Sequence, residues 1–234
     1  MNKRIENGPL GKLLRTLGFL AVLVGALYIA TKLVLEHADI SFIANAVEFA
    51  EMVDEQLVHV SFLNDTAYVF LALVVGFLLL LWVIRKGIIL RVLLTALLVV
   101  GFILDAAAGQ SFLAPIEVIR PEWLVEVLAA LEDQINELRS LSDFLVPGIS
   151  LATAFFLWVL FSYKRPRRIS TFILSGAATL LFLAILMNYV GSTFFSDLLE
   201  PGTTGDTVMI TLYLAAYLLI IAGSAFGIVG FIRK

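Results

Sequence analysis

The chain has 234 residues, of which 61% are hydrophobic and only 15% are charged, and its mean hydropathy is +1.01. This composition lies outside the range of soluble globular proteins, in which charged residues alone make up about a quarter of the chain. The sequence contains no cysteine, which excludes disulfides, thiol chemistry and cysteine-ligated clusters. The composition therefore predicts an integral membrane protein.

Six apolar runs approach the length that a helix needs to cross a hydrocarbon core of about 30 Å. They are approximately Leu17–Leu35, Ala67–Ile84, Ile88–Leu104, Val146–Phe161, Ile169–Val190 and Val208–Ile232. The third and fourth runs are short, and their ends are the least certain. Six spans leave too little sequence for a separate soluble domain. We therefore expect an all-α polytopic protein with one membrane domain, 1–234.

Basic residues are segregated along the chain. All lysines and arginines lie at the termini or in or next to the two short connections between runs, except Lys32, Arg120 and Arg139. Because Lys and Arg resist translocation, this side is predicted to be cytoplasmic, with both termini inside and three longer excursions outside. Glu6 is the only acidic residue outside those excursions, although acidic residues contribute little to orientation. The pattern predicts a protein of a bacterial or archaeal cytoplasmic membrane.

The first outer excursion contains an amphipathic helical pattern over Asp39–Phe62. Its apolar residues fall on one stripe at helical spacing, and its acidic residues lie away from that stripe. The apolar residues are Ile43, Val47, Ala50, Val53, Leu57 and Val60. We expect a helix with a solvated acidic face.

The second outer excursion predicts a helix over Pro121–Leu145, because proline is favoured in the first turn. Its apolar residues recur at heptad spacing over about two heptads, fewer than a secure coiled-coil prediction requires. They are Leu124, Leu128, Leu131, Ile135 and Leu138. Two interpretations stay open: the helix packs on its own chain or lies in the outer membrane interface, or these residues form an association surface between subunits.

An internal repeat is suggested by two sets of matching positions. Leu81-Trp82-Val83 recurs as Leu157-Trp158-Val159, and Arg15, Arg91 and Arg167 share the same offset. Each unit reads as a basic start, a span, an outer excursion, a second span and a basic end, so the units are predicted to be parallel repeats. The predicted hairpins are about 15–86, 88–164 and 168–234.

Few polar side chains lie within the apolar runs. Lys32 and Asp105 both fall near the outer ends of their spans, where they are two interfacial residues or an ion pair. Asn188 is the only amide side chain inside a span, and we expect it to bond a neighbouring helix or a headgroup, with substrate binding as the alternative. The deeper positions offer hydroxyls: Thr95, Thr153, Ser175, Thr179 and Thr211.

Small residues in the last run are spaced for close helix packing. Gly223 and Gly227 form a Gly-x-x-x-Gly pattern, which lets two helix backbones approach each other in lipid. The partner helix belongs either to the same chain or to another subunit, and the pattern is compatible with both.

The sequence offers little for catalysis. His37 and His59 are the only histidines, and both lie in the first excursion, so no histidine is available inside the membrane to bind a cofactor. We find no phosphate-binding glycine loop, no Ser/His/Asp arrangement and no metal motif. We therefore expect neither an enzyme nor a cofactor or metal.

Two functional hypotheses follow for a protein held in the lipid bilayer. The first is a non-enzymatic subunit or scaffold whose outer helices, 39–62 and 121–145, associate with a membrane-protein partner or form a homo-oligomer. The second is a passive channel or transporter, built as an oligomer, with an acidic, cation-selective outer vestibule and a conduit lined by hydroxyls and Asn188. Nothing in the sequence suggests nucleic-acid binding.

Overall fold

The described residues of this computed structural model form helices and short connections. They are 8–37, 66–84, 88–108, 113–116, 119, 122–130, 148–162, 169–195, 197, 199–200 and 202–232. The helices are α2 (Pro9–His37), α4 (Thr66–Ile84), α5 (Ile88–Ala108), α6 (Glu122–Ala130), an unlabelled helix (Gly148–Ser162), α8 (Ile169–Phe194) and α9 (Thr204–Ile232). These residues contain no β-strand, which confirms the all-α prediction.

Each predicted apolar run coincides with a helix, and the longest helices extend beyond the runs. Proline stands at the first position of α2, where its missing N–H costs nothing. α9 begins after Gly202, whose φ of 85° suits glycine. Thr203 Oγ1 then accepts a hydrogen bond from the Asp206 N–H at 3.2 Å, and Asp206 accepts one from the Gly202 N–H at 3.2 Å. These two bonds satisfy backbone donors at the start of α9.

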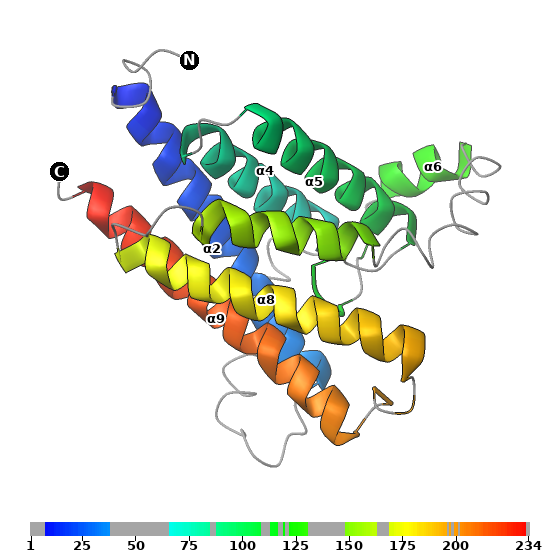
Figure 1. The fold of residues 1–234 in the computed structure, drawn as a ribbon. Helices are drawn as coiled ribbons and strands as arrows, with labels where there is room; N and C mark the ends of the chain where they lie inside the picture. The colour runs from blue at the N-terminus through cyan, green and yellow to red at the C-terminus, as the bar shows by residue number, and fades with distance from the viewer. Residues whose placement is uncertain are drawn as a thin grey trace.

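The long helices form a bundle in which α8 and α9 make the most extensive pair, and α2 packs on both α4 and α9 (Figure 1). α5 packs on α4. The start of α2 and the end of α9 lie at the same end of the bundle, and α6 lies off to one side beyond the far end of α5 (Figure 1). Chain neighbours α8 and α9 are therefore antiparallel, whereas α2 and α8 begin at the same end.

Glycines bring α2 and α4 into close contact. A Cβ atom at Gly76 would lie 2.9 Å from the backbone nitrogen of Val22 and 3.0 Å from the carbonyl oxygen of Gly18. A Cβ atom at Gly25 would lie 2.9 Å from the Cβ atom of Leu73. The two helices thus approach closely enough for backbone contact, which is how helices gain packing energy when the surrounding solvent is also apolar.

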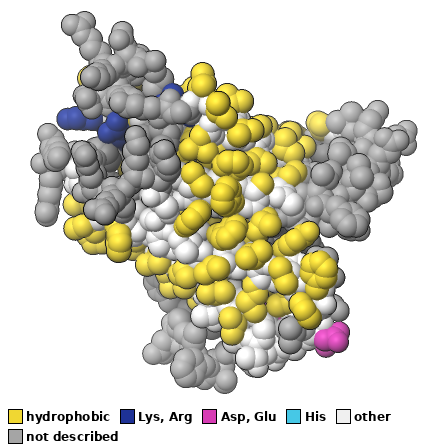
Figure 2. Space-filling model, viewed as in Figure 1, with side chains coloured by type: hydrophobic (Ala, Val, Ile, Leu, Met, Phe, Trp, Pro, Cys, Tyr) yellow, Lys and Arg dark blue, Asp and Glu magenta, His cyan; other side chains and the backbone are white. Residues whose placement is uncertain are grey.

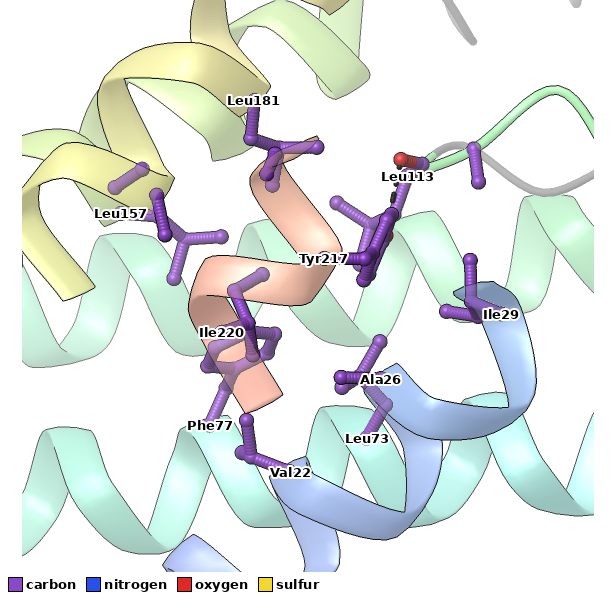
Figure 3. Close-up of a cluster of buried hydrophobic side chains, with 14 of the residues drawn as sticks. Val22, Ala26, Ile29, Leu73, Phe77, Leu113, Leu157, Leu181, Tyr217 and Ile220 are labelled. Carbon is purple, nitrogen blue, oxygen red and sulfur yellow. Dashed lines mark hydrogen bonds between the residues drawn. The ribbon is translucent and has the colours of Figure 1, made fainter. Parts of the chain in front are cut away.

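The core lies where α2, α4 and α9 meet the Gly148–Ser162 helix and α8 (Figure 3). Val22 and Ala26 of α2 point toward Phe77 and Leu73 of α4, and Ile220 of α9 lies beside them. Leu157 and Leu181 complete the cluster from the other side. Most of the buried side chains are aliphatic, aromatic or alanine.

A short non-helical segment, Leu113–Ile116, enters this core. Leu113 is fully buried, and Ala114 and Ile116 retain only 2% and 3% of their exposed surface. The sequence predicts this stretch as part of an outer excursion, and its burial among the helices was not anticipated. Non-helical backbone is tolerated at such depth only where protein or water satisfies its polar groups.

Apolar side chains also cover the outside of the bundle (Figure 2). On α2 they recur at spacings of three and four residues: Leu10, Leu13, Leu17, Leu20, Val24 and Leu27. On α5 they cover a wide face: Ile88, Ile89, Val92, Leu93, Val99, Val100 and Ile103. Three stretches among the described residues are long and apolar enough to cross a membrane: Pro9–Val34, Ile169–Gly191 and Thr204–Gly230.

Candidate functional site: buried polar groups around α9

Three hydroxyl side chains lie on the buried side of α9. Tyr213, Tyr217 and Ser224 are spaced four and seven residues apart, which places them along one face of the helix. Tyr213 and Tyr217 retain 2% and 1% of their exposed surface, and Ser224 retains none. Because a buried hydroxyl loses its water, each of these groups needs a protein or water partner.

Tyr217 obtains its partner from the buried non-helical segment. Its hydroxyl donates a hydrogen bond to the Leu113 carbonyl at 3.1 Å, within the core (Figure 3). Six residues after Leu113, the Ile119 carbonyl accepts a hydrogen bond of 3.1 Å from the Ala67 N–H at the start of α4. Trp123 of α6 then donates to the Tyr68 hydroxyl at 2.7 Å. The Leu113 carbonyl lies outside any helix and so has no backbone hydrogen bond within one. The Tyr217 hydroxyl supplies it with a donor.

The side chain of Tyr213 interacts with that of Asn188 in α8. Asn188 is half-buried, and the contact joins the two helices of the most extensive pair. The structure thus places the one amide predicted inside a span against a neighbouring helix. Substrate binding by Asn188 stays a prediction.

In the described part of the chain, two buried hydroxyls have no hydrogen-bond partner. The Oγ1 atom of Thr153 and the Oγ atom of Ser224 are both buried, and neither residue has any exposed surface. Unsatisfied buried hydroxyls are uncommon, and they often mark a position where water or another small polar group binds.

Other hydroxyls in the helices are paired. Ser162 and Ser175 share a hydrogen bond of 2.7 Å between the Gly148–Ser162 helix and α8. Thr179 and Thr211 each bond the carbonyl four residues before them, at 2.9 Å and 2.7 Å. Thr95 accepts a bond of 3.2 Å from the Trp82 indole. These hydrogen bonds join two helices or successive turns of one helix. They therefore contribute to helix packing.

Lys32 and Asp105, the predicted interfacial pair, lie in the second halves of α2 and α5. The Lys32 ammonium is 6.0 Å from the centroid of the Tyr28 ring, at the limit of a cation–π contact. The side chain of Asp105 falls outside the described atoms, so the ion pair between these residues stays a prediction.

The predicted Gly-x-x-x-Gly residues make contacts within the chain. A Cβ atom at Gly223 would lie 2.8 Å from Leu174 of α8, and one at Gly227 would lie 2.9 Å from the Phe19 ring of α2. α9 therefore uses Gly223 to approach α8 and Gly227 to approach α2.

The association surface on the second excursion is described only in part. α6 covers Glu122–Ala130, the beginning of the predicted helix, and it contains Leu124 and Leu128. The side chains of these two leucines are not described. Outside the described part of the chain lie Leu131, Ile135, Leu138 and the whole predicted helix 39–62. His37 ends α2, and His59 is likewise outside the described part.

Comparison with protein-family models, curated proteins and solved structures finds no match. The chemistry must therefore be inferred from the residues themselves. Among the described residues, no group of three His, Asp or Glu side chains is placed to hold a metal ion.

Sequence reasoning missed Tyr213, Tyr217 and the buried Leu113 carbonyl. A signal was present for the tyrosines, because Tyr213, Tyr217 and Ser224 share one helical face inside a long apolar run. The burial of Leu113 had a weaker signal, the apolar sequence Phe112-Leu113-Ala114-Pro115-Ile116 within an otherwise polar excursion.

Proposed function

We propose that this protein is an integral membrane protein of six transmembrane helices with both termini in the cytoplasm. α2, α8 and α9 have 29, 26 and 29 residues, and α4 and α5 have 19 and 21. At a rise of about 1.5 Å per residue, α4 and α5 nearly match a hydrocarbon core of about 30 Å, and the other three exceed it. The Gly148–Ser162 helix supplies the sixth span.

Three parallel hairpins are part of this proposal. α2 with α4, and α8 with α9, run antiparallel and pack together. The two repeated tryptophans each contact the next described helix: Trp82 donates a hydrogen bond to Thr95, and Trp158 stacks on Phe182 with ring centroids 6.5 Å apart. These contacts support equivalent junctions between successive hairpins.

The proposed role is that of a non-enzymatic subunit or scaffold that associates through its outer helices with a membrane-protein partner or another copy. The observation that carries this role is the close-packed interior, in which Gly18 and Gly76 bring helix backbones into contact and apolar side chains fill the core. A bundle packed in this way offers its outer helices and its outward faces for interaction.

The association is tested by native mass measurement and by crosslinking in native membranes. We expect the wild-type protein to form an oligomer or a defined complex. Replacing Leu128 and Ile135 with Glu, on the predicted heptad stripe, should dissociate it, whereas Ala129→Glu, at an exposed α6 position off that stripe, should leave it intact. A monomer without a crosslinked partner would contradict the proposal.

A passive, cation-selective channel built as an oligomer is the second candidate. It is favoured by the unpaired Thr153 and Ser224 hydroxyls together with the Asn188–Tyr213 pair, because these groups could line a path for water and ions. Cation flux into liposomes that contain the purified protein would support it, and Ser224→Ala should then alter the flux. Impermeable liposomes would exclude it.

A further inference from the structure

Arg91, in the first turn of α5, is a buried cation. It retains 6% of its exposed surface, and its Nε atom is buried without a hydrogen-bond partner. Its guanidinium carbon lies 5.4 Å from the centroid of the Trp82 ring on α4. That ring is held in turn by the bond from its Nε1 atom to Thr95, one helical turn beyond Arg91. The guanidinium is thus positioned by a fixed aromatic ring.

No carboxylate in the described part of the chain lies at this end of the bundle. The described acidic side chains belong to α6 and to the region of the α8–α9 turn, and Figure 2 shows Lys and Arg near the termini with Asp or Glu at the opposite end. Glu6 is the only acidic residue in the sequence outside the three outer excursions, and it lies outside the described residues. Arg91 therefore needs an anion that this part of the chain does not supply.

The free-energy cost of burying a guanidinium is large unless it is paired. A cation–π contact such as that with Trp82 offsets only part of this cost. A phosphate oxyanion or a carboxylate can accept two parallel hydrogen bonds from the planar guanidinium, and the described carboxylates lie elsewhere in the bundle, which leaves phosphate as the anion that fits.

The surface around Arg91 indicates where that phosphate comes from. Trp82 is 41% exposed, and Ile88, Ile89 and Val92 in the same turns of α5 are 68%, 73% and 56% exposed. Acyl chains would cover these side chains in a bilayer, while a headgroup would lie at the level of the helix end. A diacyl phospholipid supplies both parts in one molecule, whereas free phosphate supplies only the anion.

We propose that Arg91, positioned by the Trp82 ring, binds the phosphate of a membrane phospholipid at the α4–α5 end of the bundle. This site rests on the proposed insertion of α4 and α5 into the bilayer, and it does not depend on oligomer formation or on a conducting path.

The test measures the thermal unfolding of full-length protein, delipidated in a neutral detergent, with three added probes. They are phosphatidylglycerol in mixed micelles, diacylglycerol with the same acyl chains, and inorganic phosphate at the same phosphate concentration. We expect phosphatidylglycerol to raise Tm by a few degrees and the other two to have little effect. An equal rise in Tm with inorganic phosphate would show that the site binds a soluble anion, which would overturn the phospholipid as the ligand. An equal rise with diacylglycerol would overturn the phosphate site.

Variants separate binding from a purely structural role. Arg91→Gln should weaken the lipid effect about tenfold or more in concentration. Lys12→Gln removes the same charge from an exposed position on α2 and should retain the effect. Without lipid, Arg91→Gln should be at least as stable as the wild type, because an uncompensated buried charge is removed. A variant that is less stable by the same amount with and without lipid would contradict the proposal.

Two further measurements keep the test decisive. If Arg91→Gln does not fold, Trp82→Leu, which removes the ring beneath the guanidinium, should still weaken the lipid effect, and an unchanged response of that variant would overturn the site. Extraction of membranes with alkaline carbonate reports on insertion separately. Protein released by carbonate would overturn the membrane proposal itself, whereas retained protein without a phosphatidylglycerol effect would overturn only the lipid site.

Discussion

Gly76 is the residue at which α2 and α4 leave no room for a side chain. An added Cβ atom would lie 2.8 Å from Val22 Cγ2 and 2.9 Å from the Val22 backbone nitrogen, and the backbone cannot give way as a flexible side chain could. We predict that Gly76→Ala lowers the free energy of unfolding by about 1–3 kcal/mol because the helices must separate. Thermal unfolding in detergent measures the change.

The matched control is Gly176 on α8. A Cβ atom there would meet only Leu219, at 3.9 Å, which is an ordinary van der Waals contact. Gly176→Ala should therefore be neutral or stabilising by up to about 1 kcal/mol, since alanine favours the helix. Equal effects of the two substitutions would show that the α2–α4 contact is looser than described.

Tyr217 carries a second prediction at the scale of single residues. Tyr217→Phe keeps the ring but removes the hydrogen bond to the buried Leu113 carbonyl, which should cost about 1–3 kcal/mol. Hydrogen exchange at Ala114 and Ile116 should become faster, because a bond that ties this segment to α9 is lost. Tyr68→Phe removes the more exposed bond from Trp123 and should change stability by no more than about 0.5 kcal/mol. Unchanged exchange in Tyr217→Phe would contradict this account.

At the scale of elements, the turn that joins α8 to α9 depends on glycine. Gly202 has a φ of 85°, a conformation that other residues adopt at a cost of about 1–2 kcal/mol. We predict that Gly202→Ala destabilises the protein by about this amount in thermal unfolding. Gly148→Ala is the control, because a Cβ atom there meets nothing within 4 Å and the position needs no positive φ. Similar losses in both variants would point to a general effect of losing glycine.

The helices were largely predictable, and the contacts between them were not. Runs such as Ile169–Val190 predict helices because backbone groups in an apolar environment must bond one another, and α8 contains that whole run. The Gly-x-x-x-Gly spacing predicts close packing but cannot say that Gly223 meets α8 and Gly227 meets α2. That choice depends on the relative rotation of three helices. The burial of Leu113 depends likewise on a partner, Tyr217, about a hundred positions away.

At the scale of the whole molecule, the direction of the helices constrains the number of crossings. α2 and α8 begin at the same end of the bundle, so they run parallel (Figure 1). If both cross a membrane, the chain between them must cross back an odd number of times. The described helices along the bundle in that interval are α4, α5 and the Gly148–Ser162 helix. Among the described helices, either one or all three of these cross, which gives four or six spans when α9 is included.

Cysteine mapping separates six spans from the four-span arrangements in which α4 or α5 crosses back, and it is practical because the chain has no cysteine of its own. Lys12, Glu122 and Glu200 are exposed and suit single substitutions to Cys. For six spans with cytoplasmic termini, a membrane-impermeant maleimide should label Glu122→Cys and Glu200→Cys in intact cells, and Lys12→Cys only after permeabilisation.

This expectation follows from counting helices between the labelled sites. α2, α4 and α5 separate Lys12 from Glu122, and two more helices separate Glu122 from Glu200, so the last two sites share a side. With four spans in which α4 or α5 is the helix that crosses back, Glu122 would share a side with Lys12 instead. An inverted result, with Lys12→Cys labelled in intact cells and the other two protected, would keep the six crossings. It would also contradict the positive-inside rule, which places the basic end of the bundle in the cytoplasm.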